Sequence, residues 1–162
     1  MQKDEVKIYT DGAASGNPGP GGYGVVMLYG SHRKELSEGF KQTTNNRMEL
    51  MAVIKGLEAL TRKNLKVKIF TDSKYVSDAV NQGWIYQWEA KRFKKKKNVD
   101  LWKRFLELYR DYDIDIIWIK GHAEIPENER CDRIAVKASQ EKNLSIDSGY
   151  VENLNEDLPG FL

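Results

Sequence analysis

Runs of β-branched and aromatic residues predict three strands in the first quarter of the chain. The first run, Val6 to Thr10, is closed by Asp11-Gly12, and two more follow at 22–30 and 33–41. The Gly/Pro-rich segment between the first two runs is expected to be a loop, GAASGNPGPGG (12–22). The chain is therefore predicted to open with an antiparallel meander.

A helical period follows the meander. Apolar residues fall at i, i+3, i+4, i+7 and i+10 and predict one buried stripe on a helix from about 46 to 62, formed by Leu50, Val53, Ile54, Leu57 and Leu60. A fourth strand is expected at 67–70, ending at Thr71-Asp72. Ser73 is a favourable N-cap for a short helix over 74–80.

The second half of the chain continues to alternate helices with strands. A second short helix is expected to carry Trp84 and Trp88. A fifth strand is expected at 114–119. Two further apolar stripes predict helices on either side of that strand, the first with Leu101, Phe105, Leu108, Tyr109 and Tyr112 and the second with Cys131, Ile134, Ala135 and Ala138.

This order of elements predicts an α/β fold with a mixed five-stranded sheet and helices on both faces. Strands 1–3 are expected to be antiparallel, and strands 1, 4 and 5 parallel. Ligands of such sheets gather at the carboxyl ends of the strands, where Asp11 and Asp72 stand. We expect one catalytic domain over 1–150 and an acidic, partly ordered tail over 151–162, the acidic composition beginning near residue 143.

Composition narrows the class of protein. A chain of 162 residues that is 40% hydrophobic fits one core. The only cysteine, Cys131, cannot form an internal disulfide or a cysteine-based zinc site, so any metal must be held by oxygen or histidine. No apolar run approaches the roughly 18 residues of a membrane span, and the charged start does not fit a secretory signal. A cytoplasmic monomer is expected.

The charge is unevenly distributed, although the net charge is only +2. Six of the seven residues from Lys91 to Lys97 are basic, whereas 143–162 holds four acids and no Lys or Arg. Such a basic run is either a solvated face or a site that attracts phosphates.

Four acids are candidates for a metal site. Asp11 and Asp72 each follow a Thr at a strand end, and neighbouring strands lie about 4.8 Å apart, so both carboxylates can stay charged only with a cation between them. Glu49 and Asp132 each lie beside an apolar helical stripe that could aim them at the same sheet end. Carboxylates alone suit Mg²⁺, and two ions about 3.5 to 4 Å apart are the standard device for phosphodiester displacement. The alternative for each acid is a surface carboxylate or helix cap.

Two other features are less specific. The glycine-rich segment contains neither G-x-G-x-x-G nor G-x-x-x-x-G-K-[ST], so a tight turn is favoured over a nucleotide cradle. His122 lies in a Gly-His-Ala sequence after the fifth strand. It is either an ordinary loop residue or an exposed imidazole that shuttles protons.

Six stretches keep a distinctive order and spacing and cover nearly everything from residue 5 to 150: YTDGAASGNPGPGGYG (9–24), TTNNRMEL (43–50), FTDSKYV (70–76), NVDLW (98–102), KGHAEIPENERCD (120–132) and DSGY (147–150). They resemble the type 1 ribonuclease H family of bacteria. The resemblance implies a ribonuclease H-like fold and a sequence-non-specific endonuclease. Such an enzyme hydrolyses the RNA strand of RNA/DNA hybrids and leaves 5′-phosphate and 3′-hydroxyl ends.

The resemblance also implies roles for the acids and for His122. Two Mg²⁺ ions, replaceable by Mn²⁺, would share Asp11, with Asp132 on the ion that activates water and Glu49 and Asp72 on the ion at the leaving oxygen. His122 matches a mobile histidine that assists protonation or product release.

Substrate contacts are implied in the same way, and they fall on the two strands of the hybrid. Asn17, Asn45 and Asn46 would contact RNA 2′-hydroxyls and bases in the minor groove, since only RNA offers a 2′-hydroxyl. Gly12 is a further substrate-binding candidate. The DNA strand would be held by a grip on one phosphate and by an aromatic channel, formed by Thr44, Asn98, Trp84 and Trp88. Core packing is the alternative for at least one of the tryptophans. A basic handle supplies phosphate attraction through Lys94, Lys95, Lys96 and Lys97.

The chain departs from the family pattern at three positions and in the handle. Lys74, a further substrate-binding candidate, occupies a position where many relatives have Gln. Gln42 lies where some relatives have a phosphate-binding Arg, and Glu124 lies where Gly is common. The handle is several residues shorter than in the best-known bacterial type. Affinity and metal preference depend on these differences, whereas the reaction class depends on the four acids.

Three other functions are weighed against this one. An inactive module that binds hybrid or double-stranded RNA would not cluster four acids that repel phosphate. A transposase-like or other structure-specific nuclease on the same fold is disfavoured by the single-domain length and by the GNPGPGGYG and TTNNRMEL blocks. A nucleotide-binding α/β protein would need a phosphate-loop signature.

Overall fold

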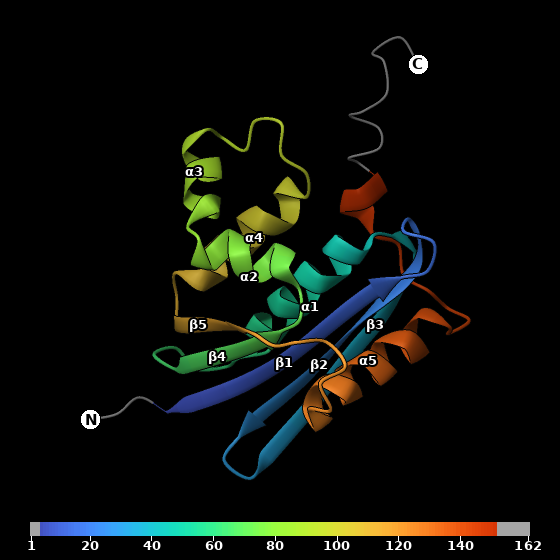
Figure 1. Ribbon diagram of the computed structural model, residues 1–162, viewed down its shortest axis with the longest axis horizontal. Coiled ribbons are helices and arrows are strands. Elements are labelled where there is room, and N and C mark those ends of the chain that lie inside the picture. Colours follow the sequence, from blue (N-terminus) through green and yellow to red (C-terminus); the bar gives the residue numbers. More distant parts are fainter. Residues whose placement is uncertain (1–3, 152–162) are drawn as a thin grey trace.

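The computed structural model describes residues 4–151. Ten elements follow one another along the chain (Figure 1). The strands are β1 (Glu5–Ala14), β2 (Gly19–Tyr29), β3 (His32–Thr43), β4 (Lys66–Thr71) and β5 (Asp113–Trp118). The helices are α1 (Asn45–Glu58), α2 (Lys74–Asn81), α3 (Trp84–Ala90), α4 (Val99–Tyr109) and α5 (Pro126–Ser139). No helix of the described chain is long and apolar enough to cross a membrane.

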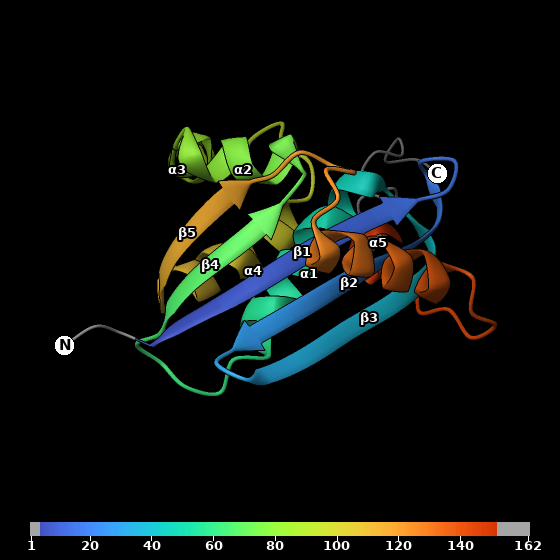
Figure 2. The same ribbon diagram turned by 60° about the horizontal axis from the view of Figure 1, so that its bottom comes forward.

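The sheet has the predicted architecture. Its strand order is β3-β2-β1-β4-β5, with β1, β2 and β3 antiparallel and with β4 parallel to both β1 and β5. Helix α5 packs on β1, β2 and β3 from one face, while α1 and α4 lie on the other (Figure 2). The mixed α/β sheet with helices on both faces is confirmed.

The glycine-rich segment is mostly strand, and its interpretation as a loop was wrong. β1 runs on to Ala14 and β2 begins at Gly19, so only 15–18 turn. The glycines are needed here because α5 lies very close to the strand backbone, and not because the segment turns. A Cβ on Gly22 would lie 2.5 Å from the carbonyl oxygen of Ala135, and one on Gly24 would overlap the carbonyl of Cys131. Because these glycines have no side chain, the sheet leaves room for α5, a helix that begins more than 100 residues later.

The main core lies between the sheet and α1. The stripe of α1 is fully buried at Leu50, Val53, Ile54 and Leu57. The helix ends at Glu58 and not near 62, so Leu60 reaches the core from the segment that follows. The same core continues under α4, where Trp102 is fully buried with its ring centroid 5.7 Å from those of Trp88 and Phe105.

The acidic composition that begins near residue 143 does not keep the chain from packing against the sheet and α1 before residue 151. Ser145 pairs with Phe40 of the edge strand β3 as an isolated bridge. Asp147 is only 3% exposed because it forms an ion pair with the buried Arg47. Acidic composition therefore does not mean exposure here. The predicted tail over 151–162 falls, apart from Val151, outside the described residues.

Candidate active site

Three of the four candidate acids meet where the parallel pairing of β1 with β4 ends. Tyr9 and Phe70 are the last pair of that ladder, which places Asp11 and Asp72 two residues further on, side by side. Glu49 reaches the same place from α1. One carboxylate oxygen from each of the three residues lies within 4.8 Å of the others. Asp11 and Glu49 are buried, at 8% and 7% exposure, and Asp72 is half-buried.

Gly12 lets α1 approach β1 closely enough for this meeting. A Cβ at position 12 would lie 2.6 Å from the backbone nitrogen of Glu49 and would overlap the backbone of Met48. The Gly12 N–H donates to Glu49 Oε1 at 2.7 Å and to Asp11 Oδ1 at 2.9 Å. One backbone amide therefore orients two of the three carboxylates.

The surroundings of the cluster disfavour the charged form of its acids, as the raised pKa values of these acids show. Burial raises the pKa of Asp11 to about 7, and the charges of Asp72 and Asp132 add to that effect. Burial, with the charge of Asp11 next, raises the pKa of Glu49 well above its usual value. Glu49 Oε2 is buried without a hydrogen-bond partner. An unpaired acceptor among crowded carboxylates fits a hard divalent cation, because oxygen is the ligand such cations prefer.

Asp132 and His122 come from α5 and from the loop before it, and both affect the charge of the cluster. Asp132, on α5, is half-buried and is not among the three carboxylates within 4.8 Å of one another. Burial raises the pKa of Asp72, with the charge of Asp132 adding to the rise and His122 opposing it. His122 is exposed in the loop between β5 and α5, with a left-handed φ of 58°. Both side chains thus act electrostatically on the cluster.

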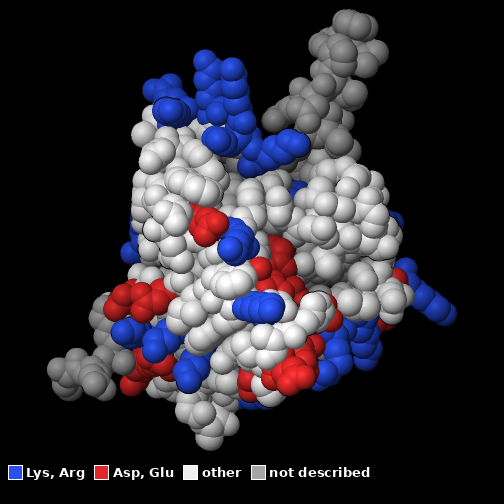
Figure 3. Space-filling model, viewed as in Figure 1, with Lys and Arg blue, Asp and Glu red and all other residues white. Residues whose placement is uncertain are grey.

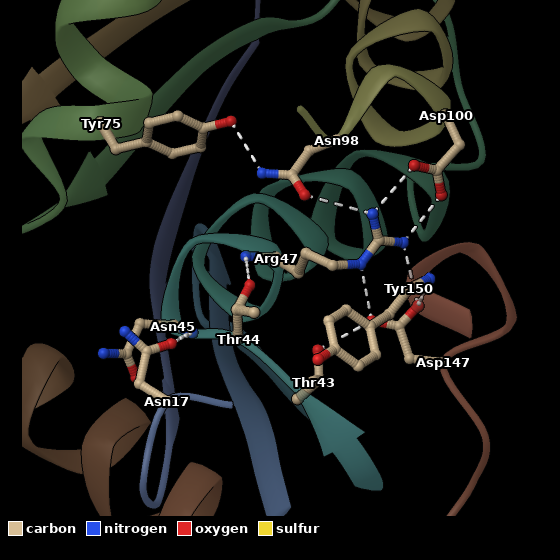
Figure 4. A network of polar contacts seen from close by, with 10 residues as sticks. All are labelled: Asn17, Thr43, Thr44, Asn45, Arg47, Tyr75, Asn98, Asp100, Asp147 and Tyr150. Carbon is tan, nitrogen blue, oxygen red and sulfur yellow. Dashed lines mark hydrogen bonds and ion pairs between the residues drawn. The ribbon is translucent and has the colours of Figure 1, made fainter. Parts of the chain in front are cut away.

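The polar candidates for the RNA strand form a connected group at the start of α1 (Figure 4). The Asn45 N–H donates to Asn17 Oδ1 at 2.9 Å, and Asn45 Oδ1 accepts from the Ala14 N–H at 2.6 Å. Asn46 beside them is exposed. Thr44 is the N-cap of the helix, and its Oγ1 accepts from the Arg47 N–H at 3.2 Å. Asn17 and Asn45, 28 positions apart, are therefore neighbours.

The candidates for the DNA strand lie around α3 and the start of α4. Trp88 is half-buried against Trp102, with Lys96 Nζ 5.0 Å from the centroid of its ring, whereas Trp84 is 43% exposed. Trp88 is therefore partly a core residue, which is the alternative that the sequence left open for at least one tryptophan. Asn98, immediately before α4, is buried. Lys94 to Lys97 are exposed, and Figure 3 shows basic side chains gathered over this end of the molecule. We call 94–97 the basic handle.

Two residues near the site were not singled out from the sequence. Trp118, at the end of β5, is 43% exposed; its Nε1–H donates to the backbone oxygen of Asp72 at 3.1 Å, and Lys74 Nζ lies 4.8 Å from its ring centroid. The position of Trp118 at the end of a strand, close to the candidate acids, is the sequence signal that could have pointed to it. Arg47 is 1% exposed, and only its place within TTNNRMEL pointed to it.

Comparisons with known proteins agree with this fold and this site. Residues 3–140 match the family model described as RNase H. The ribonuclease H of Rippkaea orientalis is 54% identical over 151 residues, which cover 90% of this chain and 92% of that protein. The solved structure of LC9-RNase H1, a type 1 RNase H with the type 2 active-site motif, superposes with a TM-score of 0.79 at 29% identity, covering 94% of this chain and 81% of that one. The fold is also shared with LC11-RNase H1 in complex with RNA/DNA hybrid, with a TM-score of 0.65 at 24% identity, covering 82% of this chain and 95% of that one.

An α/β sheet with clustered carboxylates at its strand ends, matched over most of its length, defines the class as a nuclease of the ribonuclease H-like fold. The chain belongs to the ribonuclease H family, and within it to type 1 ribonuclease H. It is therefore a hydrolase, an endoribonuclease that acts on RNA/DNA hybrids, and its family depends on divalent metal.

The crowded carboxylates predict an unusual dependence of stability on pH when a chelator removes metal. A carboxyl whose pKa is raised by folding binds its proton more tightly in the folded state. The free energy of unfolding should therefore fall as pH rises from the unfolded value of 3.8 through about 7. Asp11→Asn removes this penalty and should raise the free energy of unfolding at pH 8 by roughly 2 kcal/mol. Denaturant titrations with chelator at pH 5.5 and pH 8 measure both effects. An equal or lower stability of Asp11→Asn at pH 8 would contradict the electrostatic account.

Proposed function

We propose that this chain cuts the RNA strand of RNA/DNA hybrids with two Mg²⁺ ions held by Asp11, Glu49, Asp72 and Asp132. The observation that carries the proposal is the cluster of three carboxylates with Glu49 Oε2 buried and unpartnered. Mn²⁺ should substitute, because it also accepts oxygen ligands. The cytoplasmic location and the monomeric state stay predictions from the sequence.

The four carboxylates divide between the two ions. Asp11 is the most central member, since its pKa is raised by the charges of both Asp72 and Asp132. Glu49 and Asp72 would complete one ion site with it, and Asp132 the other. When bound, such ions activate water and stabilise the charge on the attacking and leaving oxygens of an in-line displacement.

The remaining step is the movement of protons. A water oxygen forms a bond to phosphorus and gives up a proton as the bond between phosphorus and the 3′-oxygen breaks, and the 3′-oxygen takes up a proton. The products are a 5′-phosphate and a 3′-hydroxyl. His122 is suited to the proton transfer because it is exposed, and because its charge already affects the pKa of Asp72. Water can replace it in part, so His122 assists without being essential.

Recognition of the hybrid would use different chemistry for each strand. Asn17, Asn45 and Asn46, with the backbone at Gly12, offer polar groups to the RNA 2′-hydroxyls. Thr44 and Asn98 would hold a phosphate of the DNA strand. Trp84 and the exposed part of Trp88 offer apolar surface to deoxyribose. Lys74 and the basic handle add phosphate attraction that does not depend on sequence.

Asp11→Asn tests the cluster. The variant should lose cleavage and keep hybrid binding at low salt, because the lost charge serves the metal site and otherwise repels phosphate. Labelled hybrid, duplex RNA, duplex DNA and single strands are incubated with wild type and variant, with Mg²⁺ or with chelator. Cleavage of only the hybrid's RNA, and only by wild type with Mg²⁺, is the expected result. Substantial cleavage by Asp11→Asn would remove Asp11 from the centre of the site.

The basic handle is tested by the salt dependence of hybrid binding, measured with Ca²⁺ to suppress cleavage. Lys94→Gln with Lys97→Gln leaves the contact between Lys96 and Trp88 intact. If both lysines touch phosphates, the slope of log affinity against log salt should shrink by about two units. The control is Lys7→Gln with Lys34→Gln, which makes the same charge change at two exposed positions toward the end of β1 and β3 that lies away from the acids. This variant should leave the slope nearly unchanged. Equal slopes for the two pairs would make the handle a solvated face.

A further inference from the structure

Arg47 is a buried guanidinium tied to two acids from distant parts of the chain (Figure 4). It is 1% exposed. Its Nη1 and Nη2 donate to the two carboxylate oxygens of Asp100 at 2.9 and 2.7 Å. Its Nε and Nη2 donate to the two carboxylate oxygens of Asp147 at 2.7 and 2.9 Å. Every nitrogen of the side chain is thus committed, and α1, the start of α4 and the segment before residue 151 are held at one point.

The same guanidinium also orients Asn98. Arg47 Nη1 donates to Asn98 Oδ1 at 3.4 Å, and Asn98 Nδ2 donates to Tyr75 Oη at 3.0 Å. Arginine has donors only, so the amide must turn its oxygen toward Arg47 and its NH₂ group away. One amide hydrogen goes to Tyr75, and the second is the one that a phosphate oxygen would accept.

The backbone at the same position orients the other half of the proposed phosphate grip, Thr44. The Arg47 N–H donates to Thr44 Oγ1, so the hydroxyl has its own hydrogen left to donate elsewhere. Thr44 and Asn98 are 54 positions apart, and one residue bonds to both of them. Its backbone fixes Thr44 and its side chain fixes Asn98.

We propose that Arg47 is a positioning residue for the DNA strand: it holds Thr44 and Asn98 so that both present donors to one phosphate. The inference rests on the proposed function. Buried ion pairs are often no more stabilising than apolar packing, so a fully paired guanidinium here is better explained by the geometry it imposes than by stability alone.

The surroundings of Asp147 are arranged to keep this geometry. Thr43 Oγ1 donates to Asp147 Oδ2 at 2.7 Å and holds the carboxylate in place. A Cβ at Gly149 would overlap both Asp100 Oδ2 and Arg47 Nη2. The DSGY stretch therefore supplies an acid and, two residues later, the space that the ion pairs need.

A double-mutant cycle on hybrid cleavage tests the proposal. Arg47→Lys keeps the charge but has three donors on one nitrogen, so it cannot replace the five hydrogen bonds that the guanidinium donates to Asp100, Asp147 and Asn98. It is made in the wild-type background and in Asn98→Ala, and kcat and KM are measured for the four proteins. Arg104→Lys is the matched control, because Arg104 on α4 also pairs with an acid of α1, Glu58, away from Asn98.

Arg47→Lys should raise KM by about 5- to 20-fold in the wild-type background, the effect of losing one or two oriented hydrogen bonds to a charged group, with kcat changed by less than about twofold. In Asn98→Ala the same substitution should raise KM by less than about threefold. Arg104→Lys should leave both constants unchanged. An unchanged KM, or equal increases in the two backgrounds, would overturn the positioning role.

Two further variants keep the test decisive if Arg47→Lys does not fold. Asp147→Asn preserves the volume of the acid and weakens one ion pair, while Gly149→Ala displaces the guanidinium sterically. Each should reproduce the selective rise in KM, and thermal melts show which variants are folded. If folded Asp147→Asn and Gly149→Ala cleave with wild-type KM, the inference fails. Wild type that does not cut the hybrid would instead refute the proposed function.

Discussion

The arrangement at the active end of the sheet depends on holding three carboxylates together against their mutual repulsion. Parallel pairing of β1 with β4 sets Asp11 beside Asp72, and the absence of a side chain at Gly12 lets α1 bring Glu49 into the same space. The fold thus stores an electrostatic cost where a cation can relieve it, as expected when a site is built for binding rather than for stability. The raised pKa of each of the three acids reflects that cost.

Helix α1 carries both Glu49, which belongs to the crowded cluster of acids, and Arg47, whose ion pairs hold the helix in place. Glu49 has a buried oxygen without a partner, whereas Arg47, two residues earlier, is bonded by two carboxylates from outside the helix. Because both residues belong to the first turns of one helix, the ion pairs that fix Arg47 also restrain the backbone that carries Glu49. The cluster of acids and the proposed phosphate grip therefore share helix α1, through Glu49 in the first and Thr44 with Arg47 in the second.

The sequence was sufficient for features that depend on local pattern and insufficient for those that depend on distant partners. The neighbouring positions of Asp11 and Asp72 and the stripe of α1 followed from the sequence pattern, although β1 continues past Asp11 to Ala14. The sheet order followed from the succession of elements. The glycine-rich segment 12–22 was assigned to a loop because the helix that needs a bare surface at Gly22 begins more than 100 residues later. The burial of Asp147 could not be predicted because its partner, Arg47, is 100 positions away, and no local signal marks a buried acid.

Charge separation along the surface explains how a site rich in acids can receive a polyanion. The carboxylates repel phosphate until metal neutralises them, and the net charge of +2 is too small to attract nucleic acid over a distance. Exposed charges are screened beyond about 8 Å at physiological salt, so attraction must come from cations that touch the backbone. In the proposed function, the basic handle supplies such cations on a segment separate from the acids, and this segment packs on the core through the contact of Lys96 with the ring of Trp88. Attraction by the handle and hydrolysis at the acids could then be altered independently, because they rest on residues of opposite charge in different elements.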